Sequence, residues 1–99
     1  MTDGRIALTI EDRIATVTID RPAKLNALTN DMLAELEAAA GDLDRNTEIR
    51  AIILTGTGEK AFCAGADIAA WGDLDPLTMW RRWIRDGHRL FDRLAQLRQ

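Results

Sequence analysis

The sequence predicts an α/β fold, because two strand-like runs, an amphipathic helix and a buried strand follow one another along the chain. Apolar and polar residues alternate over 5–10 and again over 14–19, as in two paired strands. Apolar residues then recur at helical spacing over about 30–44. The run at 51–55 is apolar without alternation, which indicates a strand in a parallel sheet with both faces covered. A strand, a helix and a second strand in this order predict a crossover unit.

Short local signals place the boundaries of these elements. The polar pair Glu11-Asp12 is expected to separate the two strands of a hairpin, although it lacks the glycine that tight hairpin turns favour. Arg21-Pro22 ends the second strand, because proline has no N–H to donate to a neighbouring strand. Thr29 is expected to cap the helix, which ends near Asn46. The apolar stripe of this helix consists of Met32, Leu33, Leu36, Ala40 and Leu43.

A second helix is predicted to begin at Asp75-Pro76, since aspartate is a favoured cap and proline a favoured first residue. Its apolar side is expected to comprise Trp80, Trp83, Ile84, Gly87, Phe91, Leu94 and Ala95. We interpret the two tryptophans as packing anchors. The helical pattern continues to Gln99. One hairpin, one buried strand and two helices hardly suffice to cover both faces of that strand. We therefore expect the chain to be the front part of a larger domain.

Composition excludes several classes of protein. A length of 99 residues allows one domain at most, and 46% hydrophobic with 29% charged residues is typical of a globular chain. The net charge of −3 does not indicate a basic surface that would bind nucleic acid. A single cysteine cannot form an internal disulfide, and one histidine without a cysteine pair argues against a metal site. No signal peptide or membrane-spanning apolar run is visible, so we expect a cytoplasmic protein.

The segment Gly56 to Ala61 reads G-x-G-x-x-A directly after a strand, which raises the alternative of a small Rossmann-type nucleotide binder. That fingerprint requires a helix to open at the second glycine. Gly65 follows within a few residues and opposes a helix, so an ordinary glycine turn is the preferred interpretation.

Two single side chains could carry chemistry. Cys63 could be a nucleophile, but a reactive thiol needs an activating base or a positive environment, and a small buried thiol is the commoner fate. The only histidine, His88, lies on another predicted element, where a packing or capping role is preferred over catalysis.

The late helix also carries a row of like charges. The preferred interpretation is a solvated face, in which Asp86 and Asp92 offset the repulsion between the arginines. The alternative is a surface that contacts phosphate or another subunit. The row consists of Arg81, Arg85, Arg89 and Arg93.

The segment FCAGAD, residues 62–67, combines small residues with a glycine. Asp67 alone is a weak acid–base candidate, and its expected role is to tie down the turn through bonds to backbone N–H groups. A turn of small residues leaves main-chain N–H groups open to a ligand, and such groups can form half of an oxyanion hole. The backbone of this segment is therefore a stronger candidate than its side chains.

Two segments together, RPAKLNAL at 21–28 and AIILTGTGEKAFCAGADI at 51–68, resemble the front of the enoyl-CoA hydratase/isomerase (crotonase) superfamily. The resemblance implies a crotonase-like (ClpP/crotonase) ββα superhelix, incomplete in this chain, with 1–99 as the N-terminal portion of a single domain. It implies a lyase of fatty acid metabolism, an enoyl-CoA hydratase that adds water to a 2-enoyl-CoA through an oxyanion-stabilised enolate. An enoyl-CoA isomerase, an acyl-CoA hydrolase, a decarboxylase and a non-catalytic module that binds CoA or a partner are the alternatives.

The resemblance also implies site residues. The N–H of Ala66 would be one of two oxyanion donors, and the second donor and the catalytic glutamates would lie beyond Gln99. The chain alone is therefore expected to be inactive. Coenzyme A belongs to the substrate, so no separate cofactor is expected, and the family assembles as trimers or hexamers. The implied CoA contacts are Ala23, Lys24, Leu25, Ala64, Gly65, Ala66, Asp67 and Ile68.

Overall fold

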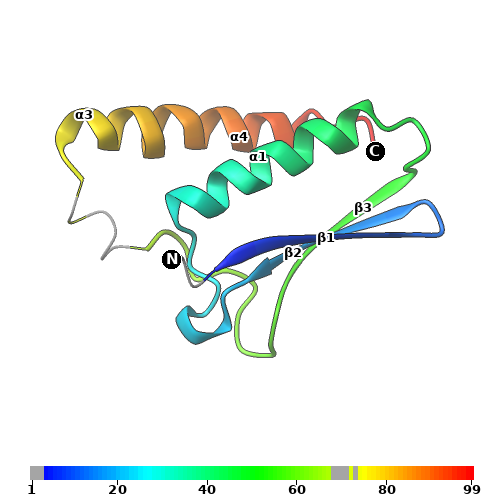
Figure 1. Cartoon of the computed structure of the whole chain (residues 1–99), viewed down its shortest axis with the longest axis horizontal. Helices are drawn as coiled ribbons and strands as arrows, with labels where there is room; N and C mark the ends of the chain where they lie inside the picture. The colour runs from blue at the N-terminus through cyan, green and yellow to red at the C-terminus, as the bar shows by residue number, and fades with distance from the viewer. Residues whose placement is uncertain (1–3, 68–71, 73) are drawn as a thin grey trace.

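The computed structural model describes residues 4–67, 72 and 74–99. Its long helices lie together on one side of a three-stranded sheet of order β1-β2-β3, and a short helical turn lies beyond one end of the sheet (Figure 1). The elements are β1 (Arg5–Glu11), β2 (Ile14–Asp20), η1 (Pro22–Lys24), α1 (Asn30–Arg45), β3 (Ala51–Gly56), α3 (Pro76–Thr78), η2 (Met79–Arg85) and α4 (Asp86–Ala95).

The predicted hairpin is confirmed, with its turn one residue later than expected. β1 pairs antiparallel with β2, and Glu11 still belongs to the ladder opposite Ile14. The two-residue turn is Asp12-Arg13, with φ angles of 52° and 67°. Two successive left-handed residues match the right-handed twist of the strands, and an aspartate at the first position makes that turn accessible without glycine.

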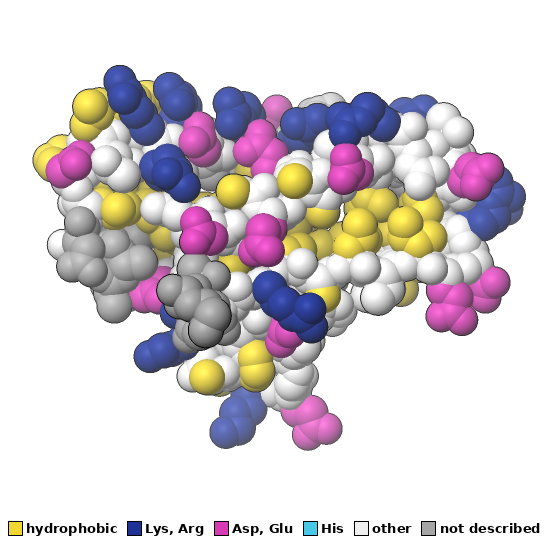
Figure 2. All heavy atoms as spheres, in the orientation of Figure 1, with side chains coloured by type: hydrophobic (Ala, Val, Ile, Leu, Met, Phe, Trp, Pro, Cys, Tyr) yellow, Lys and Arg dark blue, Asp and Glu magenta, His cyan; other side chains and the backbone are white. Residues whose placement is uncertain are grey.

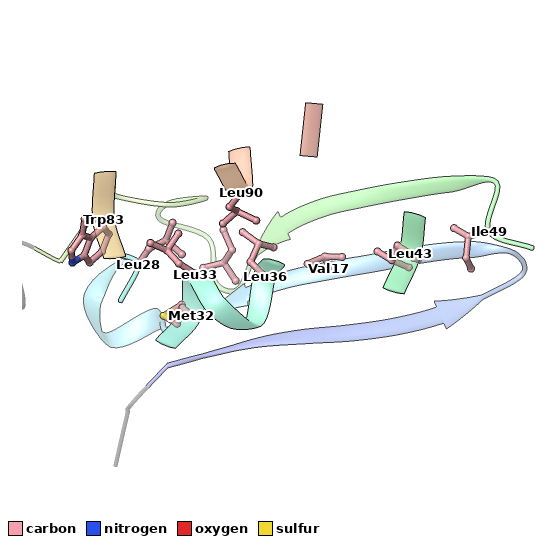
Figure 3. Packing of buried hydrophobic residues seen from close by; sticks show 11 residues of the cluster. Val17, Leu28, Met32, Leu33, Leu36, Leu43, Ile49, Trp83 and Leu90 are labelled. Atoms are coloured by element: carbon pink, nitrogen blue, oxygen red, sulfur yellow. The ribbon is translucent and has the colours of Figure 1, made fainter. Parts of the chain in front are cut away.

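The main core forms where α1 packs on the sheet. Thr29 caps α1 as predicted, because its hydroxyl accepts a hydrogen bond from the Met32 N–H at 3.2 Å. Alternate residues of β2 point toward this helix and are buried (Figure 3). Each buried aliphatic side chain contributes roughly 1.5–3 kcal/mol to stability. The core comprises Ala15, Val17, Ile19, Leu28, Met32, Leu33, Leu36, Leu43, Ile49, Trp83 and Leu90.

β3 pairs in parallel with β2, from Ile14 opposite Ala51 to Ile19 opposite Gly56, so the predicted crossover unit is confirmed. The expectation that this strand is covered on both faces is wrong for the described chain. Ile53 and Leu54 are exposed, because β3 is an edge strand here and α1 packs over β1 and β2 instead.

The late helix begins as predicted, with the Asp75 carboxylate accepting from the Thr78 N–H at 2.8 Å; this bond holds the pKa of Asp75 below its ordinary value. Its first half, η2, is a π-helix. The wider π turn changes which residues share a face, and the predicted apolar stripe is partly wrong for that reason. Trp83 is buried as expected, whereas Trp80 is 53% exposed and packs against little of the described chain, so its predicted role as a packing anchor is not confirmed here.

In α4 the buried position is Leu90, with 1% of its surface exposed, whereas the predicted Phe91 is 51% exposed. The stripe that faces α1 continues from Trp83 through Gly87 and Leu90 at spacings of four and three residues. The helix ends at Ala95, so the expectation of a helix continuing through Gln99 is also wrong.

The predicted arginine row is interrupted by the π-helix, and part of it links the two long helices. Arg89 contacts Glu37 of α1 at 3.1 Å, and Arg93 lies 4.0 Å from the same carboxylate. Exposed ion pairs of this kind contribute about 0–1 kcal/mol each. Basic side chains line the outer edge of the helix layer in Figure 2, as expected for a mainly solvated face.

Candidate active site

Two loops far apart in the sequence meet at one end of the sheet. The loop 21–28 follows β2, and the segment 57–67 follows β3. Because β2 and β3 are parallel neighbours, both loops leave the same edge of the sheet. Three backbone hydrogen bonds join them: Ala64 N to Leu25 O at 3.0 Å, Leu28 N to Gly65 O at 2.8 Å, and Asp67 N to Leu28 O at 2.9 Å. The two segments that resemble the crotonases thus form a single structural unit.

The last two of these bonds fix the orientation of Ala66. Both involve Leu28, and they form an isolated parallel bridge between Leu28 and Ala66. In such a bridge the bonds come from the residues on either side of Ala66, so its own N–H points away from the 21–28 loop. The Ala66 N–H donates no hydrogen bond to the described part of the chain. It is therefore available to an acceptor outside the protein.

Gly65 gives the turn its shape. Its φ of +112° lies in a region that residues with a side chain rarely adopt. A Cβ at this position would meet nothing within 4 Å among the described residues, so packing does not require the glycine. The requirement is conformational, and it sets the direction of the next peptide N–H, that of Ala66.

Asn26 holds the two loops together, and the sequence analysis did not identify it. Its side chain is 1% exposed and bonds to both loops. The carboxamide oxygen accepts from the Arg21 N–H at 2.9 Å, and the amide nitrogen donates to the carbonyls of Thr57 at 2.9 Å and Ala61 at 3.0 Å. Asparagine adopts a left-handed backbone more readily than most residues, and Asn26 has a φ of 61°. An asparagine shortly after the end of a strand was the only signal in the sequence.

Asp20, the last residue of β2, makes a second link. Its carboxylate accepts from Arg5 Nε at 2.9 Å and from the Thr57 hydroxyl at 3.1 Å. These bonds, to Arg5 first and to Thr57 second, hold the pKa of Asp20 below its ordinary value. The carboxylate therefore remains ionised over the neutral range and keeps the turn after β3 attached to the strand.

Asp67 makes a buried ion pair. Arg21 Nη1 donates to Asp67 Oδ2 at 2.8 Å and to the Ala27 carbonyl at 3.2 Å. The Arg21 and Asp67 side chains are only 7% and 18% exposed. The carboxylate of Asp67 thus links its turn to the loop 21–28 through the Arg21 side chain, a partner that was not predicted from the sequence; the bonds to backbone N–H groups that were expected stay a prediction. Residues 46 positions apart give no local signal of such a pair.

The loop that was predicted to contact coenzyme A carries local strain. Leu25 has a φ of 54°, a left-handed conformation that costs an aliphatic residue roughly 1–2 kcal/mol. Strained residues of this kind cluster at functional sites. Ala23, Lys24 and Ala64 are exposed around it. A depression of about 370 Å³ lies beside this loop, lined by Pro22, Leu25, Asn26, Thr57, Gly58, Glu59, Lys60 and Ala61.

An apolar pocket of about 280 Å³ lies beside Ala66, between the FCAGAD segment and the helices. Figure 3 shows Trp83 next to Leu28 at this end of the core. Cys63 and His88 both line the pocket, but the thiol donates to the Gly65 carbonyl at 3.8 Å, and no bond joins the two side chains. His88 is exposed, so a packing role for it is not confirmed. The pocket is lined by Leu28, Leu33, Cys63, Gly65, Ala66, Trp83, Gly87, His88 and Phe91.

The segment after β3 also decides the alternative of a Rossmann-type nucleotide binder. Residues 57–67 contain no helix, so the dinucleotide fingerprint lacks the helix that it requires and that interpretation is wrong.

The predicted contact residue Ile68 lies outside the described residues. Over 4–67, 72 and 74–99, no three His, Cys, Asp or Glu side chains gather as metal ligands. In the same ranges, no helix has the length and apolar character needed to cross a membrane.

Comparison with known proteins agrees with the geometry of the two loops. The profile of the enoyl-CoA hydratase/isomerase family matches residues 14–99. The chain belongs to this family. A short-chain-enoyl-CoA hydratase of Clostridium acetobutylicum is 39% identical over 94 residues, which cover 95% of this chain and 36% of that protein. The crystal structure of an enoyl-CoA hydratase from Bacillus anthracis matches with a TM-score of 0.88 at 26% identity, covering 95% of this chain and 36% of that one.

Family members with other reactions are similar as well. A mitochondrial 3-hydroxyisobutyryl-CoA hydrolase of Gallus gallus is 40% identical over 76 residues, covering 75% of this chain and 20% of that protein. The chain thus spans about a third or less of the length of these relatives. The predicted crotonase-like fold, present in part, is confirmed.

Proposed function

We propose that the complete protein is an acyl-CoA-processing enzyme, and that its reaction is the addition of water to a 2-enoyl-CoA. The observation that carries this proposal is the free N–H of Ala66, which lies beside an apolar pocket and is fixed by the Leu28 bridge. A thioester carbonyl oxygen placed on this N–H gains negative charge as an enolate forms. A preorganised donor at that point stabilises the transition state more than the ground state.

The two hollows beside the loops suit the two ends of such a substrate. The apolar pocket takes the acyl group, because eight of its nine lining residues present apolar side chains, a thiol or no side chain. The coenzyme A portion runs over the 21–25 loop and 64–68, with contacts from Ala23, Lys24, Leu25, Ala64, Gly65, Asp67 and Ile68. No cofactor is needed besides the coenzyme A of the substrate. A cytoplasmic homotrimer or hexamer is part of the same proposal, and it rests on the family resemblance.

Among the described residues, no carboxylate lines the pocket beside Ala66, where acid–base work would be needed. The apolar pocket has no Asp or Glu among its lining residues, and Glu37 pairs with Arg89 instead. Hydration needs a base to activate water and an acid to protonate the enolate carbon. We therefore expect the purified 99-residue chain to show no hydration of crotonyl-CoA above a buffer control. Turnover by this chain would contradict the assignment of the acid–base groups to other residues.

Hydrolysis is the second candidate, because a 3-hydroxyisobutyryl-CoA hydrolase is among the similar proteins and the same oxyanion donor serves thioester cleavage. The two reactions leave different products from crotonyl-CoA. Hydration removes the conjugated double bond and leaves the thioester intact, whereas hydrolysis releases free CoA thiol.

The test uses the full-length protein. We expect loss of the ultraviolet absorbance of the conjugated enoyl thioester, without release of thiol that reacts with Ellman's reagent. Thiol release would favour the hydrolase, and a bound acyl-CoA without turnover would favour the non-catalytic module. Calorimetric titration with crotonyl-CoA and with NADH completes the comparison. Heat from NADH alone would contradict acyl-CoA binding.

A further inference from the structure

Gly87 is a buried glycine within a helix, at the wall of the apolar pocket. It belongs to α4, directly after the π-helix that carries Trp83. Glycine is unfavourable in a helix interior, because it loses more backbone freedom on folding than alanine does. A glycine at such a position usually has a packing or a functional reason. Gly87 was expected only to share the apolar side of this helix, and the structure adds that it lines the pocket.

No packing or backbone reason for Gly87 is present in the described chain. Its φ is not in the left-handed region, so alanine fits its backbone conformation. A Cβ built on it meets no described atom within 4 Å. Gly41, the buried glycine of α1, is different: there a Cβ would lie 3.1 Å from the Arg93 guanidinium. A side chain at 41 would require the Arg93 guanidinium to move slightly, whereas a side chain at 87 would meet open space among the described residues.

The empty space beside Gly87 is the pocket itself. Trp83 and Phe91 extend from the same helical segment, and Leu28 and Ala66 line the pocket from the loops. At about 280 Å³, the pocket lies just below the range of roughly 300–1,000 Å³ that ligand sites usually have. A methyl group at 87 would occupy part of this volume without displacing an atom of the described residues.

We propose that Gly87 sets the room available to an aliphatic acyl chain, and thereby the longest acyl group that the protein converts efficiently. This inference rests on the proposed function. The absence of any Asp, Glu, Lys or Arg from the lining residues favours a hydrocarbon chain over an acyl group that ends in a charge. Gly87 is a specificity-determining residue, and it does not touch the reacting atoms.

The test compares Gly87→Ala and Gly87→Val with Gly41→Ala in the full-length protein. The measured quantity is the ratio of kcat/KM for 2-octenoyl-CoA to that for crotonyl-CoA. Since one methylene changes discrimination in an apolar pocket by about 10–200-fold, we expect Gly87→Ala to lower this ratio about tenfold or more, and Gly87→Val to lower it further. Gly41→Ala is expected to leave the ratio unchanged, because that residue is not at the pocket.

Thermal unfolding separates this role from a structural one. We expect Gly87→Ala to be at least as stable as the parent, because alanine favours the helix and nothing stands in its way. A lowered melting temperature, or an unchanged ratio in a folded Gly87→Ala variant, would overturn the inference.

Binding measurements distinguish a failure of the inference from a failure of the proposed function. If the parent protein binds octanoyl-CoA and butyryl-CoA without turnover, the proposed hydration is wrong. The role of Gly87 is then decided by the ratio of the dissociation constants of these two ligands in the parent and in the Gly87 variants. If the parent neither binds nor converts any acyl-CoA, the proposed function and the inference both fail.

Discussion

Replacement of Arg21 by leucine is expected to lower the free energy of unfolding by about 3–5 kcal/mol. The substitution leaves the Asp67 carboxylate largely buried without the guanidinium that now lies 2.8 Å from it. The carboxylate stays mostly shielded from water while it loses the guanidinium, which is unfavourable for a charged group. The Ala27 carbonyl also loses a donor. Because small domains have only about 5–15 kcal/mol of stability, this single change removes a large share of it.

Denaturant-induced unfolding of the variant and its controls measures this loss. Arg45→Leu breaks an exposed pair with Asp42, both side chains being 70% exposed, and should cost at most about 1 kcal/mol. The double variant Arg21→Leu with Asp67→Leu removes both charges and should recover part of the stability. Equal, small losses for Arg21→Leu and Arg45→Leu would show that the pair with Asp67 is not important to the fold.

Gly65→Ala is expected to lower kcat of the full-length enzyme by about 10²–10³-fold, the cost of losing one oxyanion donor. Alanine does not readily adopt a φ of +112°, so the turn relaxes and the Ala66 N–H changes direction. The new methyl group itself meets nothing among the described atoms. The loss would therefore come from the backbone and appear in kcat.

Gly58→Ala is the matched control for this prediction. Gly58 also has a left-handed φ, of +81°, and a Cβ on it also meets nothing within 4 Å of the described chain. Both substitutions should lower stability by roughly 1–3 kcal/mol through backbone strain. Only Gly65→Ala should lose kcat, because Gly58 does not line the pocket beside Ala66. Gly58 lines the depression beside the 21–28 loop, so any effect of Gly58→Ala on coenzyme A binding should appear in KM. Equal losses of kcat in both would contradict a special role for Gly65.

The parts of the fold that the sequence predicted well depend on local signals. Thr29 and Asp75 cap their helices because each can bond to an N–H a few residues ahead. The hairpin follows from alternation within two short runs, and the parallel pairing of β3 follows from the order of the elements. In each case neighbouring residues contain the physical cause.

The parts that it predicted poorly depend on contacts between distant segments. In the late helix Leu90 is buried where Phe91 was expected, because the contact with α1 selects one of two adjacent apolar residues, and the local pattern does not distinguish them. Asn26 bonds to carbonyls 31 and 35 residues away. The candidate donor, Ala66, was named from the family resemblance. Its free N–H follows only from the bridge to Leu28, which needs both loops in place.

We propose that the main-chain N–H of Ala66 stabilises the charge that develops on a thioester oxygen. The most direct measurement replaces residue 66 by lactic acid in the full-length protein, which exchanges this N–H for an ester oxygen and keeps the methyl side chain. The same exchange at Ala38, an exposed residue of α1, is the control. The account predicts a fall in kcat for crotonyl-CoA hydration of about 10²–10³-fold at position 66 and little change at position 38. An unchanged kcat in a folded, acyl-CoA-binding protein with the ester at position 66 would contradict it.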